Sequence, residues 1–373
     1  MNQFMGLDVT RSQELVDPQW DDFVASVEEG QHVQTSRWAQ VKACLGWKPL
    51  RVVARCGGEV VGGAQMLIHP VAMLGLAAYV PKGPLLREPS PFVAGWIVKE
   101  IHKYCRETGV QFLSIQPANM ETLFAPLFHE VGLQESTLEL APVATILVDL
   151  RGTDEEILKR MKRQGRQNIQ ISQRKGVQVR LGGAEDIATF YQLHCQSARR
   201  QKFLPYPKRY FEGMWQVFNQ IGAAHLFFGE IDHRPVSSLL AISFNGRLST
   251  KIIGWNGEGR ECRPNEAMIW RAMQLGRDLG LRFLDFEGID LDVAVSALQK
   301  DQKPEVDEET VPSGQMDPGY ARYKFKYGGQ IVLGPRAYDL VANPFFRRMY
   351  RKLQLRVGSQ EFLSHLLDYF RKR

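Results

Sequence analysis

The chain has 373 residues, of which 44% are hydrophobic and 24% charged, a globular composition that excludes a disordered or collagen-like protein and favours two domains. The formal net charge is +6, and residues 343–373 account for all of it, because they hold eight Lys and Arg residues against two acids. No signal peptide is recognisable, and the most apolar window, 60–80, contains an unbroken run of only ten apolar residues, so we expect a soluble protein of the cytoplasm.

Two parts of the chain carry the same order of predicted elements: a hairpin, a third strand, a helix opened by proline, and a strand that follows a glycine. In the first part these elements are expected at 51–68, 77–80, 91–108 and 110–115, and in the second at 226–243, 250–253, 264–279 and 281–286. Phe112-Leu113 recurs 171 residues later as Phe283-Leu284. The sequence therefore predicts an internal duplication.

An antiparallel meander followed by a helix and a further strand is an α+β unit, and it is the core of acyltransferase folds of the N-acetyltransferase (GNAT) type. We expect two tandem GNAT-like domains, at 1–148 and 149–329, with a mobile loop at about 300–319. Fold alone does not name an activity.

Basic segments suggest a ligand that carries phosphates. A helix with a capping box at Thr153 and Glu156 leads into residues 157–180, which contain eight Lys and Arg residues and no acid. Further clusters of cations and aromatics lie at 199–203, 208–211 and 320–327. Such clusters suit a nucleotide, a pyrophosphate lipid or RNA, and a solvated helix face is the alternative reading of each one.

The tail has the pattern of a basic amphipathic helix, with apolar residues at 346, 349, 350, 353 and 357. Two readings stay open, packing of its apolar stripe on a domain and peripheral contact with an anionic membrane, which would place the protein at the inner face of that membrane.

Motifs for covalent, metal or cofactor chemistry are not recognisable. The sequence has no GxSxG, P-loop or GxGxxG, and no loop of the kind that cradles the pyrophosphate of coenzyme A. Five widely spaced cysteines form no CxxC pair, so we expect no zinc site, no disulfide and no cofactor. Asp285 and Glu287 are two apart in a predicted strand and should share one face, where a carboxylate could act on an attacking amine or order a cation. The alternative is a buried acid that is hydrogen-bonded to backbone or paired with an arginine.

Six segments, taken in order, resemble the FemABX family of peptidoglycan aminoacyltransferases over about residues 20–345. They are His32–Trp38 with Lys42 and Gly46-Trp47, Val80–Pro84, Met161–Val177, Arg200–Phe203, Leu284–Ile289 and Tyr323–Gly329. The resemblance implies a compact member without a coiled-coil arm, whose first domain is completed by the returning chain at about 330–373.

The resemblance also implies a reaction and its partners. Family members transfer an amino acid from aminoacyl-tRNA to an amine on the stem peptide of a cell-wall precursor, either UDP-MurNAc-pentapeptide or lipid II. An ester carried on RNA explains the missing coenzyme A loop. Two polyphosphorylated substrates explain the positive charge.

Roles for individual residues follow from the matching motifs. Lys42 and Arg200 resemble the positions that hold the acceptor's diphosphate, and Trp38 with the Lys82-Gly83 turn would line the same cleft. Phe325-Lys326 resembles the family's Phe-Lys pair, in which the lysine engages the terminal adenosine phosphate and offsets the charge of the tetrahedral intermediate. A surface lysine before a Gly-Gly turn is the alternative for Lys326. Further candidates for substrate contact in matching motifs are Tyr323 and Asp285.

Some questions stay open at this level. The family often carries an aspartate beyond the Gly-Pro turn, where this chain has Leu85-Leu86-Arg87-Glu88, so no general base is assigned. The alternatives are a same-fold transferase acting on an envelope polysaccharide or natural-product amine, and a catalytically silent protein that binds RNA or a membrane surface. The transferred amino acid, the acceptor's form and the oligomeric state are left undetermined.

Overall fold

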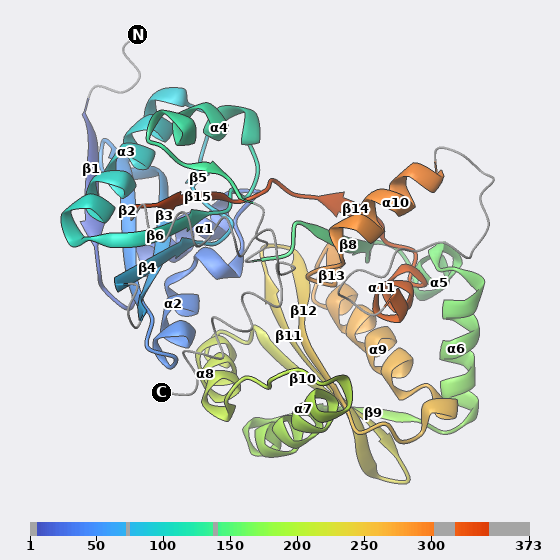
Figure 1. Cartoon of the computed structure of the whole chain (residues 1–373). Coiled ribbons are helices and arrows are strands. Elements are labelled where there is room, and N and C mark those ends of the chain that lie inside the picture. The colour runs from blue at the N-terminus through green and yellow to red at the C-terminus, as the bar shows by residue number, and fades with distance from the viewer. Residues whose placement is uncertain (1–5, 72–74, 137–140, 302–317, 343–373) are drawn as a thin grey trace. The chain divides into compact units, whose positions relative to one another are not determined.

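A computed structural model describes the chain except for residues 1–5, 72–74, 137–140, 302–317 and 343–373 (Figure 1). The chain divides into two compact units, one of residues 1–141 with 334 onward and the other of residues 142–333. The predicted tail helix lies outside the described residues, as does the predicted loop at 300–319 apart from its ends.

The first unit is built on one mixed sheet with the strand order β1-β2-β3-β4-β6-β15-β7. Strands β4 and β6 are parallel and the other neighbours antiparallel, while the short β5 pairs with β3. The strands are β1 (Leu7–Ser12), β2 (Lys48–Cys56), β3 (Glu59–Val71), β4 (Gly75–Val80), β5 (Leu85–Leu86), β6 (Val110–Ile115), β7 (Gln134–Glu135) and β15 (Tyr338–Val341). The predicted hairpin and the two following strands are confirmed.

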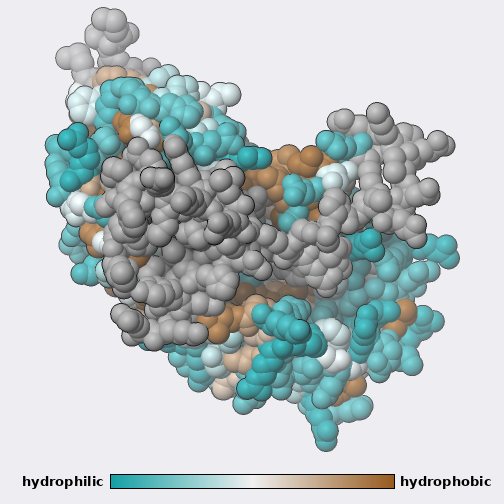
Figure 2. All heavy atoms as spheres, viewed as in Figure 1, coloured by the Kyte–Doolittle hydropathy of each residue, from teal (hydrophilic) through white to brown (hydrophobic). Residues whose placement is uncertain are grey.

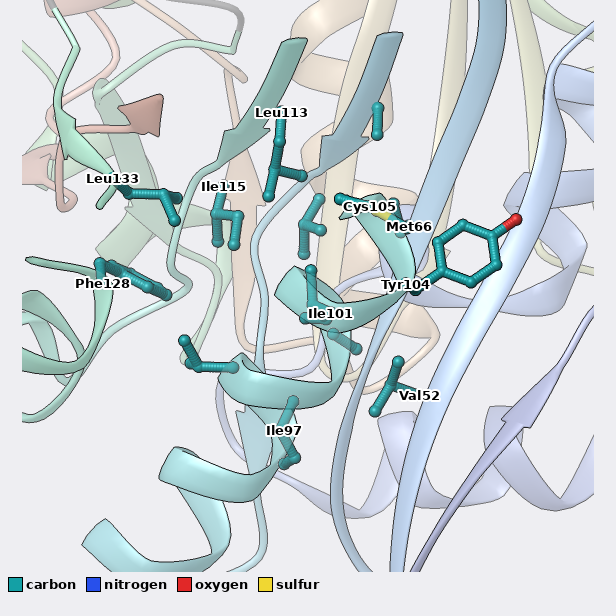
Figure 3. Packing of buried hydrophobic residues seen from close by; sticks show 14 of the residues in the cluster. Val52, Met66, Ile97, Ile101, Tyr104, Cys105, Leu113, Ile115, Phe128 and Leu133 are labelled. Atoms are coloured by element: carbon teal, nitrogen blue, oxygen red, sulfur yellow. The ribbon is translucent and has the colours of Figure 1, made fainter. Parts of the chain in front are cut away.

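Helix α3 (Pro91–Thr108) supplies much of the core of this unit. It begins where predicted, because the Ser90 side chain accepts a hydrogen bond from the Val93 amide, and it ends at Gly109, whose φ of 72° is left-handed. Its apolar face packs on the sheet, and Figure 3 shows Ile97 and Ile101 beside side chains of the strands. The other helices of this unit are α1 (Pro18–Ser26), α2 (Ser36–Ala43) and α4 (Glu121–Glu130).

The second unit repeats this arrangement with the strand order β14-β8-β13-β12-β11-β10-β9. Here β12 and β13 are the parallel pair. The strands are β8 (Ala144–Asp149), β9 (Gln178–Gly182), β10 (Ala224–Ile231), β11 (Arg234–Phe244), β12 (Arg247–Trp255), β13 (Phe283–Asp285) and β14 (Gln330–Leu333). The second set of predicted strands is confirmed, and with it the α+β class and the two GNAT-like units.

Seven α-helices accompany the second sheet in the described part of the chain. They are α5 (Asp154–Arg160), α6 (Arg163–Arg174), α7 (Ile187–Gln201), α8 (Lys208–Asn219), α9 (Pro264–Asp278), α10 (Leu291–Asp301) and α11 (Pro318–Phe325). The predicted capping box is present at the start of α5, where Thr153 and Glu156 bond each other's backbone amides. Among the coloured residues of Figure 2, hydrophilic ones predominate and smaller hydrophobic patches lie between them.

Each sheet contains one strand that lies between neighbours distant from it in the sequence. In the first sheet β15, from late in the chain, lies between β6 and β7, and in the second sheet β8 lies between β13 and β14. Both inserted strands are antiparallel to their neighbours. The sequence placed the domain boundary at 148/149, whereas β8 lies in the second unit, together with Pro142 and Val143.

Candidate functional site

The predicted site residues fall in both units, and each unit is described by itself. The first unit holds Trp38, Lys42, Lys82 and Gly83. The second unit holds Arg200, Asp285, Tyr323, Phe325 and Lys326.

Helix α2 brings Trp38 and Lys42 together. Thr35 caps the helix by accepting a hydrogen bond from the Trp38 amide at 3.2 Å. Because residues four apart share a helix face, the Lys42 ammonium lies 5.4 Å from the centroid of the Trp38 ring. Trp38 is only 5% exposed and packs edge-on against His32, whereas Lys42 is half-buried. The pair therefore presents a cation on a fixed aromatic base.

The Lys82-Gly83 turn rests on a buried glutamine. Gln34 donates from Nε2 to the carbonyl of Pro81 at 2.6 Å and to that of Gln65 at 3.1 Å, and its Oε1 accepts from the Gln65 amide at 2.7 Å. A Cβ on Gly83 would lie 2.9 Å from the Gln34 amide group, so contact with Gln34 requires the glycine. Gln34 lies in the segment His32–Trp38, which resembles the family. The sequence did not indicate that Gln34 supports this turn.

Lys326, in the second unit, is buried rather than a surface lysine. Its side chain is 7% exposed and its ammonium lies 2.6 Å from Oε1 of Glu266, near the start of α9. The ammonium also lies 4.0 Å from the centroid of the Tyr323 ring and 5.4 Å from that of Tyr327. The structure thus places two predicted residues, Tyr323 and Lys326, in one buried cluster with a carboxylate that the sequence did not indicate.

The two residues before Lys326 have different surroundings. Lys324 is buried, and its ammonium donates to the carbonyl of Phe286 at 2.9 Å and to that of Gly288, so it fixes the turn after β13. Phe325 is half-buried, with the Lys162 ammonium 5.9 Å from its ring centroid. Phe325 and Lys326 therefore do not contact the same groups, although they are sequence neighbours.

Gly165 on α6 is packed against the backbone of Lys326. A Cβ at this position would lie 2.5 Å from the Lys326 carbonyl oxygen. We expect Gly165→Ala to lower the free energy of unfolding by about 1–3 kcal/mol, because backbone rather than a flexible side chain must move. Thermal unfolding measures this loss.

Gly95→Ala is the matched control, because Gly95 is also helical and a Cβ there would meet its nearest neighbour at 3.8 Å. This variant should gain up to about 1 kcal/mol from helix propensity. Equal stability of the two variants would contradict the close approach of α6 to Lys326.

Asp285 is held by hydrogen bonds at the end of β13. Its Oδ1 accepts from the Thr145 hydroxyl at 2.6 Å and from the Glu287 amide at 2.8 Å. The prediction that Asp285 and Glu287 share one strand face is wrong, because β13 ends at Asp285 and Glu287 has a φ of +50°. These hydrogen bonds give Oδ1 of Asp285 two donors and are consistent with a structural role for this acid.

Glu287 instead pairs with Lys251 of β12, with 2.5 Å between Oε2 and the ammonium. Burial raises the pKa of the Glu287 carboxyl, and Asp285 raises it further, while Lys251 acts in the opposite direction. The register of β11 and β12 shifts so that Lys251 has no opposite residue, which is a β-bulge. The sequence suggested an arginine as the ionic partner of such an acid, whereas the partner of Glu287 is Lys251.

Arg200 lies on an aromatic ring near the end of α7. Its guanidinium carbon is 4.3 Å from the centroid of the Trp255 ring, and Nη1 donates to the Trp255 carbonyl at 3.1 Å. The side chain remains exposed. Stacking fixes the plane of the fork, which is the geometry that bidentate recognition of a phosphate requires.

No helix among the described residues is long and apolar enough to cross a membrane. They also contain no group of three or more His, Cys, Asp and Glu side chains arranged to hold a metal ion.

Comparisons with known proteins agree with this architecture. Residues 15–127 match the FemAB family, and residues 158–292 match an acetyltransferase (GNAT) domain. The lipid II:glycine glycyltransferase of Staphylococcus haemolyticus is 24% identical over 233 residues, which are 60% of this chain and 56% of that protein. The chain thus spans little more than half the length of that relative. The enzyme of the same name from Staphylococcus aureus is 22% identical over 298 residues, 77% of this chain and 69% of that one.

Among solved structures, the crystal structure of FemX superposes with a TM-score of 0.76 at 17% identity, covering 92% of this chain and 100% of that chain. The fold is thus that of two tandem GNAT units. The first of them is similar to the FemAB family over residues 15–127. In the described residues α7 and α8 are joined by residues 202–207, with no long helical arm between them.

Proposed function

We propose that the protein is an aminoacyltransferase that takes an amino acid from aminoacyl-tRNA and joins it to the stem peptide of a peptidoglycan precursor, either UDP-MurNAc-pentapeptide or lipid II. The observation that carries this proposal is the buried ammonium of Lys326, which lies in the motif shared with the FemABX family. The glycyltransferases of the two staphylococci, named for lipid II, support the acceptor class.

The proposed step is the attack of an uncharged amine on the ester carbonyl. A C–N bond forms, the bond from the carbonyl carbon to the ribose oxygen breaks, and the amine's proton is transferred to that oxygen, which leaves as a hydroxyl. The reaction depends on placement and on stabilisation of the oxyanion, so it requires no nucleophilic side chain. Lys326 would supply positive charge to the donor's terminal phosphate and to the tetrahedral intermediate.

From the matching motifs we propose Lys42 and Arg200 as ligands of the acceptor's diphosphate, and Trp38, Lys82 and Gly83 as further contacts of the acceptor. Both cations are held against indole rings, which supports their use as fixed phosphate ligands. Tyr323 and Phe325 would contact the donor beside Lys326. Asp285 has a supporting part, because its bonds hold the turn after β13.

The test is a transfer assay with the full chain, a complete set of labelled aminoacyl-tRNAs and both precursors. We expect one labelled amino acid to appear on a precursor, with the corresponding added mass. No transfer with any amino acid to either precursor would overturn the proposal. Binding of tRNA regardless of its charging, without turnover, would favour a silent RNA-binding protein.

Association with a membrane is a separate prediction. It rests on the basic pattern of residues 343–373, which lie outside the described part of the chain.

A further inference from the structure

Three segments far apart in the sequence meet in one buried polar network in the second unit. Glu266, near the start of α9, accepts from the Lys326 ammonium at 2.6 Å and from Nδ2 of Asn168 on α6 at 3.0 Å. All three residues are buried, with Glu266 and Lys326 each 6% exposed. The network joins α6, α9 and the residue that follows α11.

Stability is a weak reason for such a pair. Removing two charges from water costs several kcal/mol per ion, and an apolar pair of similar size often serves a fold as well or better. The backbone at Lys326 is held without the charge, since its carbonyl accepts from the Lys162 amide at 3.0 Å and packs on Gly165. What the carboxylate adds is control over the ammonium itself.

The charge of Lys326 depends on Glu266. Burial lowers the pKa of the Lys326 ammonium and the nearby Arg263 guanidinium lowers it further, whereas Glu266 raises it. The other titratable groups that face the ammonium are the phenols of Tyr323 and Tyr327. Without the carboxylate, the influences that remain on the pKa of Lys326 from burial and charge both disfavour its protonated form.

The ammonium also keeps capacity for a ligand. A lysine ammonium has three donors, and in the described part of the chain Glu266 is its one hydrogen-bond acceptor. Two N–H groups of a nearly buried cation thus have no acceptor among these residues. An anionic oxygen brought by a substrate would complete the set.

We propose that Glu266 is a positioning residue for the transfer reaction, which holds the Lys326 ammonium charged and oriented for the anionic oxygens of the donor and of the tetrahedral intermediate. This inference rests on the proposed function. Asn168 assists by donating to the same carboxylate oxygen, Oε1, that accepts from Lys326. Glu266 acts through Lys326 and itself needs no contact with substrate.

The test is Glu266→Gln, which keeps the size of the side chain and removes its charge. If transfer requires charged Lys326, the wild-type rate falls as pH rises through the pKa of Lys326. Because Glu266 raises that pKa, the variant should lose activity at a lower pH than wild type. At the pH where wild type is half-active, the rate should fall about fivefold, because a one-unit decrease in pKa lowers the protonated fraction from about one half to about one eleventh.

A second measurement needs no turnover. NMR titration of the full chain with isotope-labelled lysine, assigned with Lys326→Met, follows the ammonium directly and should show the same downward shift in Glu266→Gln. Asn168→Ala is the matched control, because it removes a neutral hydrogen bond to the same carboxylate and keeps the charge. The transfer rate of Asn168→Ala should fall, while the pH midpoint of its activity should equal that of wild type.

In Arg263→Met the shift should have the opposite sign, because removal of a nearby cation should move the pH midpoint of Lys326 to a higher value. It also keeps the inference testable if Glu266→Gln does not fold. The role of Glu266 would be overturned if the pH midpoint of Lys326 were unchanged in folded Glu266→Gln, or if it did not move in Arg263→Met. Either result would leave the proposed function standing. A wild-type chain that transfers nothing would instead refute the proposed function.

Discussion

Lys326→Met should slow transfer about 100-fold or more at saturating donor, the usual loss when one group that stabilises a developing oxyanion is removed. Methionine fills a similar volume and keeps the contacts of the aliphatic stem, but it offers no positive charge to the ester. The rate of a single turnover is the measurement. A variant with the wild-type rate would refute the role assigned to Lys326.

Loss of stability has to be separated from loss of chemistry in this variant. Lys326→Met leaves Glu266 as an uncompensated buried charge, which destabilises by about 3–5 kcal/mol when a buried pair is broken. The double variant Lys326→Met with Glu266→Gln removes both charges and should recover most of that stability. Its transfer rate should stay as low as that of the single variant, and recovered transfer would show that Lys326 matters only for folding.

Gln34→Ala is expected to have the largest effect in the first unit, a loss of about 3–5 kcal/mol in the free energy of unfolding. Gln34 is fully buried and bonds both the amide and the carbonyl of Gln65 as well as the carbonyl of Pro81. Alanine would leave these backbone groups buried without partners and open a cavity beneath the Lys82-Gly83 turn. Chemical denaturation measures the loss.

Gln40→Ala on the neighbouring helix α2 is the control, because the half-buried Gln40 side chain makes, among the described residues, only a 3.5 Å contact to the Ser36 carbonyl. It should change stability by less than about 0.5 kcal/mol. If Gln34→Ala were equally mild, the turn would not depend on the glutamine. Weaker binding of a UDP-linked acceptor by Gln34→Ala would further connect this support to the proposed acceptor site.

Local patterns predicted the repeated elements well, because each was marked by its own residues. Ser90 with Pro91 marked the start of α3, and Gly109 marked its end through its left-handed backbone. Thr153 and Glu156 marked α5 in the same way. Such signals act within one turn of chain, so they need no knowledge of the tertiary structure.

The network around Lys326 could not be predicted in this way. Glu266 and Lys326 are 60 residues apart, and Asn168 lies 98 residues before Glu266. Asn168 lies in the segment Met161–Val177, which resembles the family, but neither spacing nor periodicity indicates which buried acid faces which lysine. The alternation expected for Glu287 failed for a related reason, because the strand ends before the pattern does.

The positions of β8 and β15 in their sheets set the order in which the two sheets can be completed during synthesis. Residues 144–149 leave the ribosome before β9 to β13 exist, so β8 must wait for a sheet that has not yet been made. The short β7 waits longer, since its described partner is β15, about 200 residues downstream. The first sheet to begin forming is therefore completed only after β15 has been translated. Until then a nascent chain carries an open sheet edge at β6.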